Sequence, residues 1–205
     1  MRRTNTSTPS PALTFRLAAG SSDAARLQPL VQSAYRGDSS RRGWTSEADL
    51  LDGERITTAG ILEKMTAPGS AVLMAFLPPA DTDTNEDGDL LACCEIVRLP
   101  PPARRAYFGM FAVDPERQAG GYGRQVLTAA ETFARREWGA EVMEMSVIWT
   151  RKELISWYER RGYRVTGERR EFPYEDLEPG VGKVGDLHFE VLEKGLVGGK
   201  GEVGV

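Results

Sequence analysis

Residues 110–127 read MFAVDPERQAGGYGRQVL, and this stretch decides the fold. An apolar run stops at Asp114 and Pro115, a turn with three glycines follows, and a long helical pattern begins after the turn. Proline cannot donate to a sheet ladder, so Pro115 marks the end of a strand. Glycines let the backbone approach a ligand closely, and a helix that begins there points its unpaired N–H groups and its positive dipole end at the same place. The stretch therefore predicts a site for phosphate or pyrophosphate.

The spacing of these glycines indicates which phosphate ligand is bound. A P-loop requires a Lys-Ser or Lys-Thr pair after its glycines, and none follows here. A dinucleotide fingerprint requires Gly-x-Gly-x-x-Gly; Gly121 and Gly123 supply the first two glycines, but Val126 stands at the third position. Glu144 lies at about the distance expected of a ribose-binding acid. A nicotinamide dinucleotide enzyme is therefore kept as an alternative.

The spacing that fits the stretch is Gln118-x-x-Gly121-x-Gly123. It resembles the acyl-coenzyme A loop of the GNAT superfamily of N-acetyltransferases, whose pattern is Gln/Arg-x-x-Gly-x-Gly/Ala. Residues 154–164, LISWYERRGYR, are similar to a later helix of the family, which carries a Tyr and ends in Gly-Phe or Gly-Tyr. The two motifs come in the family's order and at about its distance. The resemblance covers residues 14–196 and is closest from 107 to 168.

The resemblance implies an α/β (α+β) fold: a single GNAT domain with a mixed, mainly antiparallel central sheet that is splayed in the middle and flanked by helices. A length of 205 residues suits one domain with its own core. We expect this domain at residues 13–196, between a disordered tail at 1–12, rich in Ser, Thr and Pro, and a flexible tail at 197–205. A homodimer is suggested by resemblance only.

Hydrophobic periodicity predicts the elements of the domain. Strands are expected at residues 13–18, 70–77, 90–99, 107–113, 141–148 and 187–192. Helices are expected at 22–35, at 57–65, from the glycine turn to about 138, and from 154 onward; the passages 36–43 and 172–185 are expected to be loops. The polar connection at 78–89 imitates the start of a calcium loop, but Cys94 stands where the closing Glu would fall.

Composition excludes several classes of function. A formal charge of −4 provides no basic surface for nucleic acid. No apolar run is long enough to span a membrane, and no hydrophobic stretch follows Arg2 and Arg3 as in a secretory signal, so a cytoplasmic protein is expected. Cys93 and Cys94 are neighbours that point to opposite faces of a strand, which argues against a disulfide. Two cysteines and one histidine are too few for a structural zinc site, and no metal is expected.

The resemblance implies acetyl-coenzyme A as the co-substrate. Backbone N–H groups of the glycine turn are expected to hold its pyrophosphate, and the turn comprises Gln118, Ala119, Gly120, Gly121, Tyr122, Gly123 and Arg124. In GNAT folds the strand before the turn splays from its neighbour at a bulge, and the pantetheine arm pairs with that strand as a peptide would. The strand groups that match are Phe111, Ala112 and Val113. A backbone N–H there would also hold the thioester oxygen as charge develops.

Tyr158 is the candidate general acid by its match to the family helix. A phenol has a pKa near 10, so it keeps its proton at neutral pH and can donate it to a departing thiolate. Periodicity alone places Tyr158 in the core beside Leu154 and Ile155. The base is open. Glu95 on a strand near the expected centre is the first candidate, acting through water; Glu144 and His188 are weaker, and an amine of low pKa needs none.

The acceptor is expected to be an amine, with a small molecule as the first expectation. Glu47, Asp49 and Asp52 follow one another closely and would attract a cationic amine, and by resemblance this region often forms one wall of the acceptor site. The same acids also suit the solvated first turn of a short helix. Arg151 or Lys152 stands where the family often has an Asn that contacts the cofactor. The function implied is N-acetyl transfer; a non-catalytic acyl-coenzyme A binding module is the main alternative.

Overall fold

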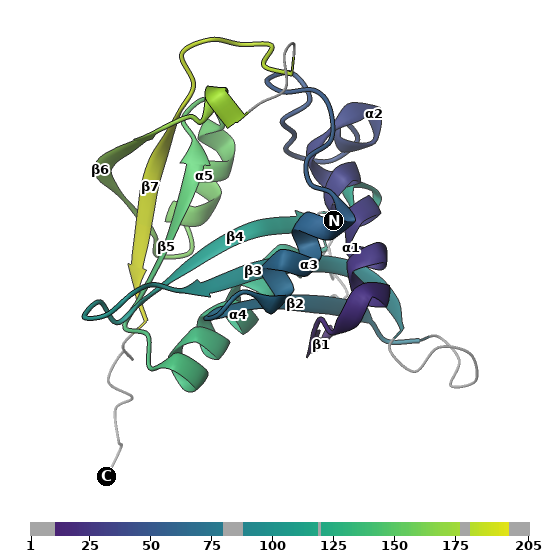
Figure 1. Ribbon diagram of the computed structural model, residues 1–205, viewed down its shortest axis with the longest axis vertical. Coiled ribbons are helices and arrows are strands. Elements are labelled where there is room, and N and C mark those ends of the chain that lie inside the picture. Colours follow the sequence, from purple (N-terminus) through teal and green to yellow (C-terminus); the bar gives the residue numbers. More distant parts are fainter. Residues whose placement is uncertain (1–10, 80–87, 119, 177–180, 197–205) are drawn as a thin grey trace, which may run out of the picture.

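The computed structural model of the chain describes residues 11–79, 88–118, 120–176 and 181–196. Its core is a seven-stranded sheet with the order β1-β2-β3-β4-β5-β7-β6 (Figure 1). The strands are β1 (Thr14–Leu17), β2 (Ser70–Leu77), β3 (Asp89–Arg98), β4 (Arg105–Val113), β5 (Val142–Ile148), β6 (Arg164–Glu171) and β7 (His188–Gly195). This mixed α/β architecture confirms the predicted fold class.

The sheet is split between β4 and β5. These two strands are parallel, whereas all the other neighbours in the sheet are antiparallel. They pair only where Arg105–Tyr107 lies beside Val142–Glu144. Beyond Tyr107 the strands separate, and Figure 1 shows the halves β1–β4 and β5–β7 diverging from that end. The predicted splay in the middle of a mainly antiparallel sheet is therefore present.

A β-bulge interrupts β4 just beyond the point of separation. Cys93 of β3 pairs with Ala112 and Glu95 pairs with Gly109, so one residue of β3 faces two residues of β4. Met110, one of those two, has φ of +43°, in the left-handed region that residues other than glycine rarely adopt. Bulges bend a strand and increase its twist. The bulge therefore helps to turn β4 away from β5.

Helices cover both faces of the larger half. They are α1 (Gly20–Tyr35), α2 (Gly37–Ser40), α3 (Thr58–Thr66), α4 (Tyr122–Trp138) and α5 (Lys152–Glu159). Apolar residues of α1 and α3 pack on one face of β2–β4, and those of α4 pack on the other. Cys93 packs on the face covered by α1 and α3, and Cys94 packs on the face covered by α4. Both thiols are free, as their adjacent positions on a strand predict.

Three passages differ from the sequence-based expectation. Residues 164–171 form β6, an edge strand that was not predicted, and the short helix α2 lies at 37–40, within a passage expected to be a loop. Residues 45–54 form turns rather than a short helix. The predicted tails lie outside the described residues except for 11 and 12, and so does most of the calcium-like segment, residues 80–87. Within the described ranges, every helix is too short or too polar to cross a bilayer.

Candidate active site

A cavity of about 480 Å³ lies in the opening between β4 and β5. One wall comes from β4 and the N-terminus of α4, and the other from β5 and α5. The C-terminal end of α1 and the segment 44–55 close a third side. The cavity is therefore a direct consequence of the splayed sheet, and it brings both sequence motifs together.

The glycine turn requires glycine for steric reasons. Gly121 is the N-cap of α4 and has φ of +74°, in the left-handed region. A Cβ at Gly120 would lie 2.4 Å from the Tyr122 ring, and a Cβ at Gly123 would lie 3.3 Å from both the Phe111 and the Trp157 rings. The first N–H groups of a helix have no acceptor within it. Because residues 121–124 all line the cavity, the N-terminus of α4 borders it.

The edge of β4 that faces the cavity also carries free donors. The amide of Asp114 donates to Leu91 of β3 at 2.9 Å. Since strand groups alternate in direction, Ala112 also turns its polar groups toward β3, and those of Phe111 and Val113 point to the edge that β5 has left. The Phe111 carbonyl accepts a hydrogen bond from the Tyr35 hydroxyl at 2.9 Å. The N–H groups of Phe111 and Val113 remain for a ligand.

The Gln118 side chain connects residues 43 and 44 to the free edge of β4. Its Oε1 accepts from the backbone N–H of Trp44 at 2.7 Å, and its Nε2 donates to the carbonyl of Val113 at 3.2 Å. A Cβ at Gly43 would lie 3.0 Å from Gln118 Oε1, so Gly43 allows the close approach. The Gln118 side chain thus positions a wall of the cavity.

Seven of the ten residues predicted to bind the co-substrate line the cavity. They are Phe111, Val113, Gln118, Gly121, Tyr122, Gly123 and Arg124. Ala112 is buried on the α1 side of the sheet, Gly120 is not in the lining, and Ala119 lies outside the described residues.

Tyr158 of α5 reaches the cavity from the opposite wall. It is 4% exposed and packs edge-on against Trp157 and Tyr163, with ring centroids 5.0 and 5.8 Å away. Its hydroxyl makes no hydrogen bond to any residue in the described part of the chain. Burial raises the pKa of Tyr158 above its usual value near 10, so the phenol stays protonated at neutral pH. A hydroxyl on a packed ring that reaches the cavity without a protein partner is suited to a substrate.

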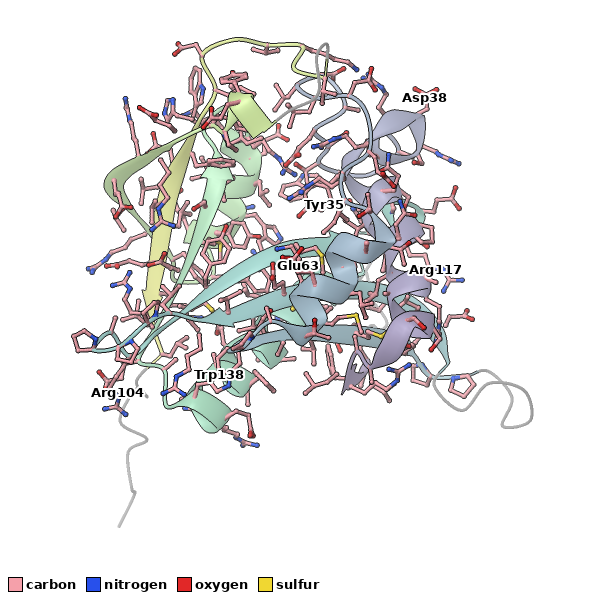
Figure 2. The ribbon with its side chains drawn as sticks, in the orientation of Figure 1. Tyr35, Asp38, Glu63, Arg104, Arg117 and Trp138 are labelled. Atoms are coloured by element: carbon pink, nitrogen blue, oxygen red, sulfur yellow. The ribbon has the colours of Figure 1, made fainter. Side chains whose placement is uncertain are left out.

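Tyr35 is a site residue that the sequence did not indicate. It ends α1, lines the cavity and donates to Phe111, and Figure 2 shows it on the side of α1 that faces β5 and α5. Burial raises the pKa of Tyr35 to about 12, so this phenol also stays protonated. In sequence it is only the last residue of an amphipathic helix, and no spacing rule connects it with residue 111.

The predicted acids lie in different surroundings. Glu47 lines the cavity, but it is 7% exposed and its two oxygens accept from Arg36 at 2.6 Å and from Arg151 at 2.7 Å. Asp49 is exposed and pairs with Arg41, and Asp52 is exposed and lies 3.1 Å from Lys183 Nζ. Only Glu47 of these three acids is among the residues that line the cavity.

The candidate bases are held by cations or lie away from the cavity. Glu95 is buried and accepts from Lys64 Nζ at 2.8 and 3.1 Å; it lies behind Gly109, where a Cβ would be 3.6 Å from its Oε2. Glu144 pairs with Arg105 and Arg170 at the closed end of the sheet. His188 stacks on Trp149 at a centroid distance of 5.4 Å and does not line the cavity.

A known protein family matches the part of the chain that contains the two motifs. The model of the acetyltransferase (GNAT) family matches residues 72–163, which include both the glycine turn and α5. The chain contains a GNAT-family domain. No curated protein sequence matched the chain. The matched segment includes the glycine turn and Tyr158, whereas Tyr35, Glu47 and Arg55 of the cavity lining lie outside it.

Solved structures share the fold of this GNAT domain at low sequence identity. The ribosomal-protein-S18-alanine N-acetyltransferase from Escherichia coli aligns with a TM-score of 0.62 and 13% identity over 94% of this chain and 99% of that one. A protein from Desulfovibrio desulfuricans, described as a GNAT-family acetyltransferase, aligns with a TM-score of 0.61 and 19% identity over 90% of this chain and 99% of that one. A chimera of the spermidine N-acetyltransferase SpeG from Vibrio cholerae and hSSAT aligns with a TM-score of 0.58 and 13% identity over 90% of this chain and 96% of that one.

Proposed function

We propose that the protein is an N-acetyltransferase that moves an acetyl group from acetyl-coenzyme A to the amine of a small molecule. One observation carries the proposal: donors for a pyrophosphate, donors for an amide arm and a protonated hydroxyl face the same cavity. They belong to the N-terminus of α4, the free edge of β4 and Tyr158. A GNAT-family domain makes acetyl transfer the chemistry to expect from this arrangement.

Binding of the co-substrate is assigned to backbone groups. The first N–H groups of α4 and its positive dipole end would hold the pyrophosphate, with Arg124 and Arg161 adding charge from the cavity wall. Arg161 is held by the carbonyl and the ring of Trp157, at 2.7 and 3.5 Å. The N–H groups of Phe111 and Val113 would pair with the amide arm as a neighbouring strand does. The site needs no metal for any of these contacts.

The proposed transfer is a direct attack of the amine on the thioester. The amine nitrogen attacks the thioester carbonyl carbon, a C–N bond forms and the C–S bond breaks. The sulfur leaves with the electron pair of that bond and takes the hydroxyl proton of Tyr158, which solvent then restores. The proton lost by the amine passes through water toward Glu95, our proposed base, whose Oε2 would lie 3.6 Å from a Cβ at Gly109, a residue that lines the cavity beside the Tyr107 ring.

Removal of the Tyr158 hydroxyl tests the proposal. We expect Tyr158→Phe to lower the rate of thiol release from acetyl-coenzyme A by about 100-fold or more, because general acid catalysis contributes about 10²–10⁴. The dissociation constant of acetyl-coenzyme A should stay within about twofold of the unmodified protein's. The matched control is Tyr163→Phe, which removes a buried hydroxyl from the same region, bound to Glu131 at 3.0 Å, outside the cavity.

Three outcomes decide between the proposal and its alternatives. Loss of turnover in Tyr158→Phe but not in Tyr163→Phe supports acid catalysis. Equal loss of turnover and affinity would mean that Tyr158 only packs. Binding of acetyl-coenzyme A with no thiol release from the unmodified protein, for any amine in a broad panel, would favour the non-catalytic binding module.

A further inference from the structure

The charges at the acceptor end of the cavity do not suit a polycation. We define the acceptor end by Tyr35, Thr45, Glu47, Arg55 and Arg151, which line the cavity and come from the end of α1, the segment 44–55 and the start of α5. Glu47 is the only acid among the described residues that line the cavity. Two arginines share this end with it, so its net charge is positive before any acceptor arrives.

The charge of Glu47 is already compensated within the protein. Its Oε2 lies 2.6 Å from Arg36 and its Oε1 lies 2.7 Å from Arg151, and the two arginine side chains are only 6% and 13% exposed. Arg151 also donates to the Thr45 hydroxyl at 3.0 Å. A carboxylate that accepts from one buried and one largely buried guanidinium group has little attraction left for a cationic substrate. The triad as a whole carries one net positive charge.

Arg55 adds a second positive charge without a compensating acid. Its guanidinium lies 5.0 Å from the centre of the Tyr35 ring. Its side chain makes no ion pair and no hydrogen bond with the residues that the structure describes. The Nε atom of Arg151 is buried and also lacks a partner in the described part of the chain. The acceptor end therefore offers unsatisfied donors and excess positive charge, which are the requirements for binding an anion.

The position of Arg55 connects this charge to the reacting atoms. The Tyr35 ring separates the Arg55 guanidinium from the free edge of β4, because the Tyr35 hydroxyl donates to the Phe111 carbonyl at 2.9 Å. An anion bound at Arg55 thus lies one tyrosine ring away from the strand that is proposed to hold the thioester. A small molecule can span that distance with its anionic group at one end and its amine at the other.

We propose that the acceptor is an amine that also carries a carboxylate, as an amino acid does, and that Arg55 and Arg151 bind this carboxylate. The inference rests on the proposed function and names the substrate class of the same cavity. Guanidinium groups suit carboxylates because their N–H donors match both oxygens. Arg124, in the first turn of α4, and Arg161, which lies on the Trp157 ring beside Gly123, remain for the phosphates of the co-substrate.

Matched pairs of acceptors test the inference. Each pair consists of an amino acid and the amine that lacks only its carboxylate, for example phenylalanine with phenethylamine and methionine with 3-methylthiopropylamine. With acetyl-coenzyme A saturating, we expect kcat/KM to be at least about tenfold higher for the carboxylate member of the pair that is turned over best. Equal or higher values for the decarboxylated amines would overturn the inference and leave the proposed function intact.

Substitution of Arg55 tests whether this residue causes the preference for acceptors that carry a carboxylate. Arg55→Gln should raise KM for the amino acid about tenfold or more, because a charge-assisted contact is lost, and it should leave the decarboxylated amine within about twofold. The control is Arg41→Gln, an arginine at the end of α2 that pairs with Asp49 outside the cavity, and it should change neither value. Weaker binding of acetyl-coenzyme A by Arg55→Gln in calorimetry would overturn the inference, since Arg55 would then serve the co-substrate. If the unmodified protein does not bind acetyl-coenzyme A at all, the proposed function fails first.

Discussion

At the scale of single residues, the environment of a side chain decides its chemistry. Tyr158 is packed among aromatic rings as a core residue would be, yet its hydroxyl reaches the cavity without a protein partner among the described residues. Glu47 shows the reverse case. The sequence suggests an acid available to a substrate, but its carboxylate is buried and pairs with Arg36 and Arg151. Burial and partners, rather than residue type, therefore separate the proposed acid from the structural carboxylate.

The raised pKa of Tyr158 predicts the pH profile of the reaction. A phenol whose pKa is raised above its usual value near 10 keeps its proton at least up to about pH 10. We expect no fall in the rate of acetyl transfer between about pH 7 and pH 9.5 from loss of the acid. A falling limb with a midpoint between pH 7 and 9 that disappears in Tyr158→Phe would contradict this assignment.

The exposed acids predict a negative result. Asp49 and Asp52 lie outside the cavity, with solvent around them. The double substitution Asp49→Asn and Asp52→Asn should change KM for the acceptor by less than about twofold, because exposed charges are screened by salt. Steady-state kinetics on the preferred amine measures it. An increase of tenfold or more would return these two acids to the acceptor wall that the sequence suggests.

At the scale of elements, the junction between β4 and α4 was the most predictable part of the molecule. Pro115, the three glycines and the apolar face of the following helix all act locally, so their spacing predicts a strand, a turn and a helix start. β6 was missed because its sequence, RVTGERRE, has no hydrophobic alternation. It is an edge strand, exposed at nearly every position, and it is stabilised by pairing with β7 rather than by burial.

The site was only partly predictable because its contacts join distant residues. Glu47 and Arg151 are 104 positions apart, and Tyr35 and Phe111 are 76 apart. No local period or motif encodes such pairs, since they form only when the sheet brings the elements together. The sequence therefore predicted the turn and Tyr158, both within motifs, but not Tyr35, Arg55 or the ion pairs of Glu47.

A carboxylate in the glycine turn tests the role of the α4 N-terminus. Gly121→Glu should abolish detectable binding of acetyl-coenzyme A, because it places a negative charge where the pyrophosphate is proposed to bind. It also forces a non-glycine residue to φ of +74°, at a cost of about 1–2 kcal/mol of folding free energy. Thr128→Glu, at an exposed position of the same helix that does not line the cavity, is the control and should bind normally. Unchanged affinity in folded Gly121→Glu would refute the assignment of the turn.

At the scale of the whole molecule, the cavity depends on how the two halves of the sheet are held at their closed end. Arg105 of β4 lies 2.9 Å from both Glu144 of β5 and Glu193 of β7. Arg170 of β6 lies 2.8 Å from Glu144, and Arg164 lies 2.7 Å from Glu193. The network crosses four strands next to the only place where β4 and β5 pair, so it joins the halves there and leaves the other end open.

This network predicts how stability depends on pH. Hydrogen bonds from Arg164 and Arg105 hold the pKa of Glu193 below its usual value of 4.5. A depressed pKa contributes stability that is present above the unfolded value and is lost as pH falls through the folded value. We expect the free energy of unfolding in urea to fall below about pH 4.5, and Glu193→Gln to show a shallower fall over that range. Parallel pH curves for the two proteins would contradict the prediction.

Calorimetric titration of the purified protein with acetyl-coenzyme A tests the central claim most directly. We predict saturable binding of one molecule per chain, because the free edge of β4 and the N-terminus of α4 offer their donors to one elongated ligand. The absence of any binding heat at several temperatures, from protein shown to be folded by circular dichroism, would contradict the account. The cavity between β4 and β5 would then need a different ligand.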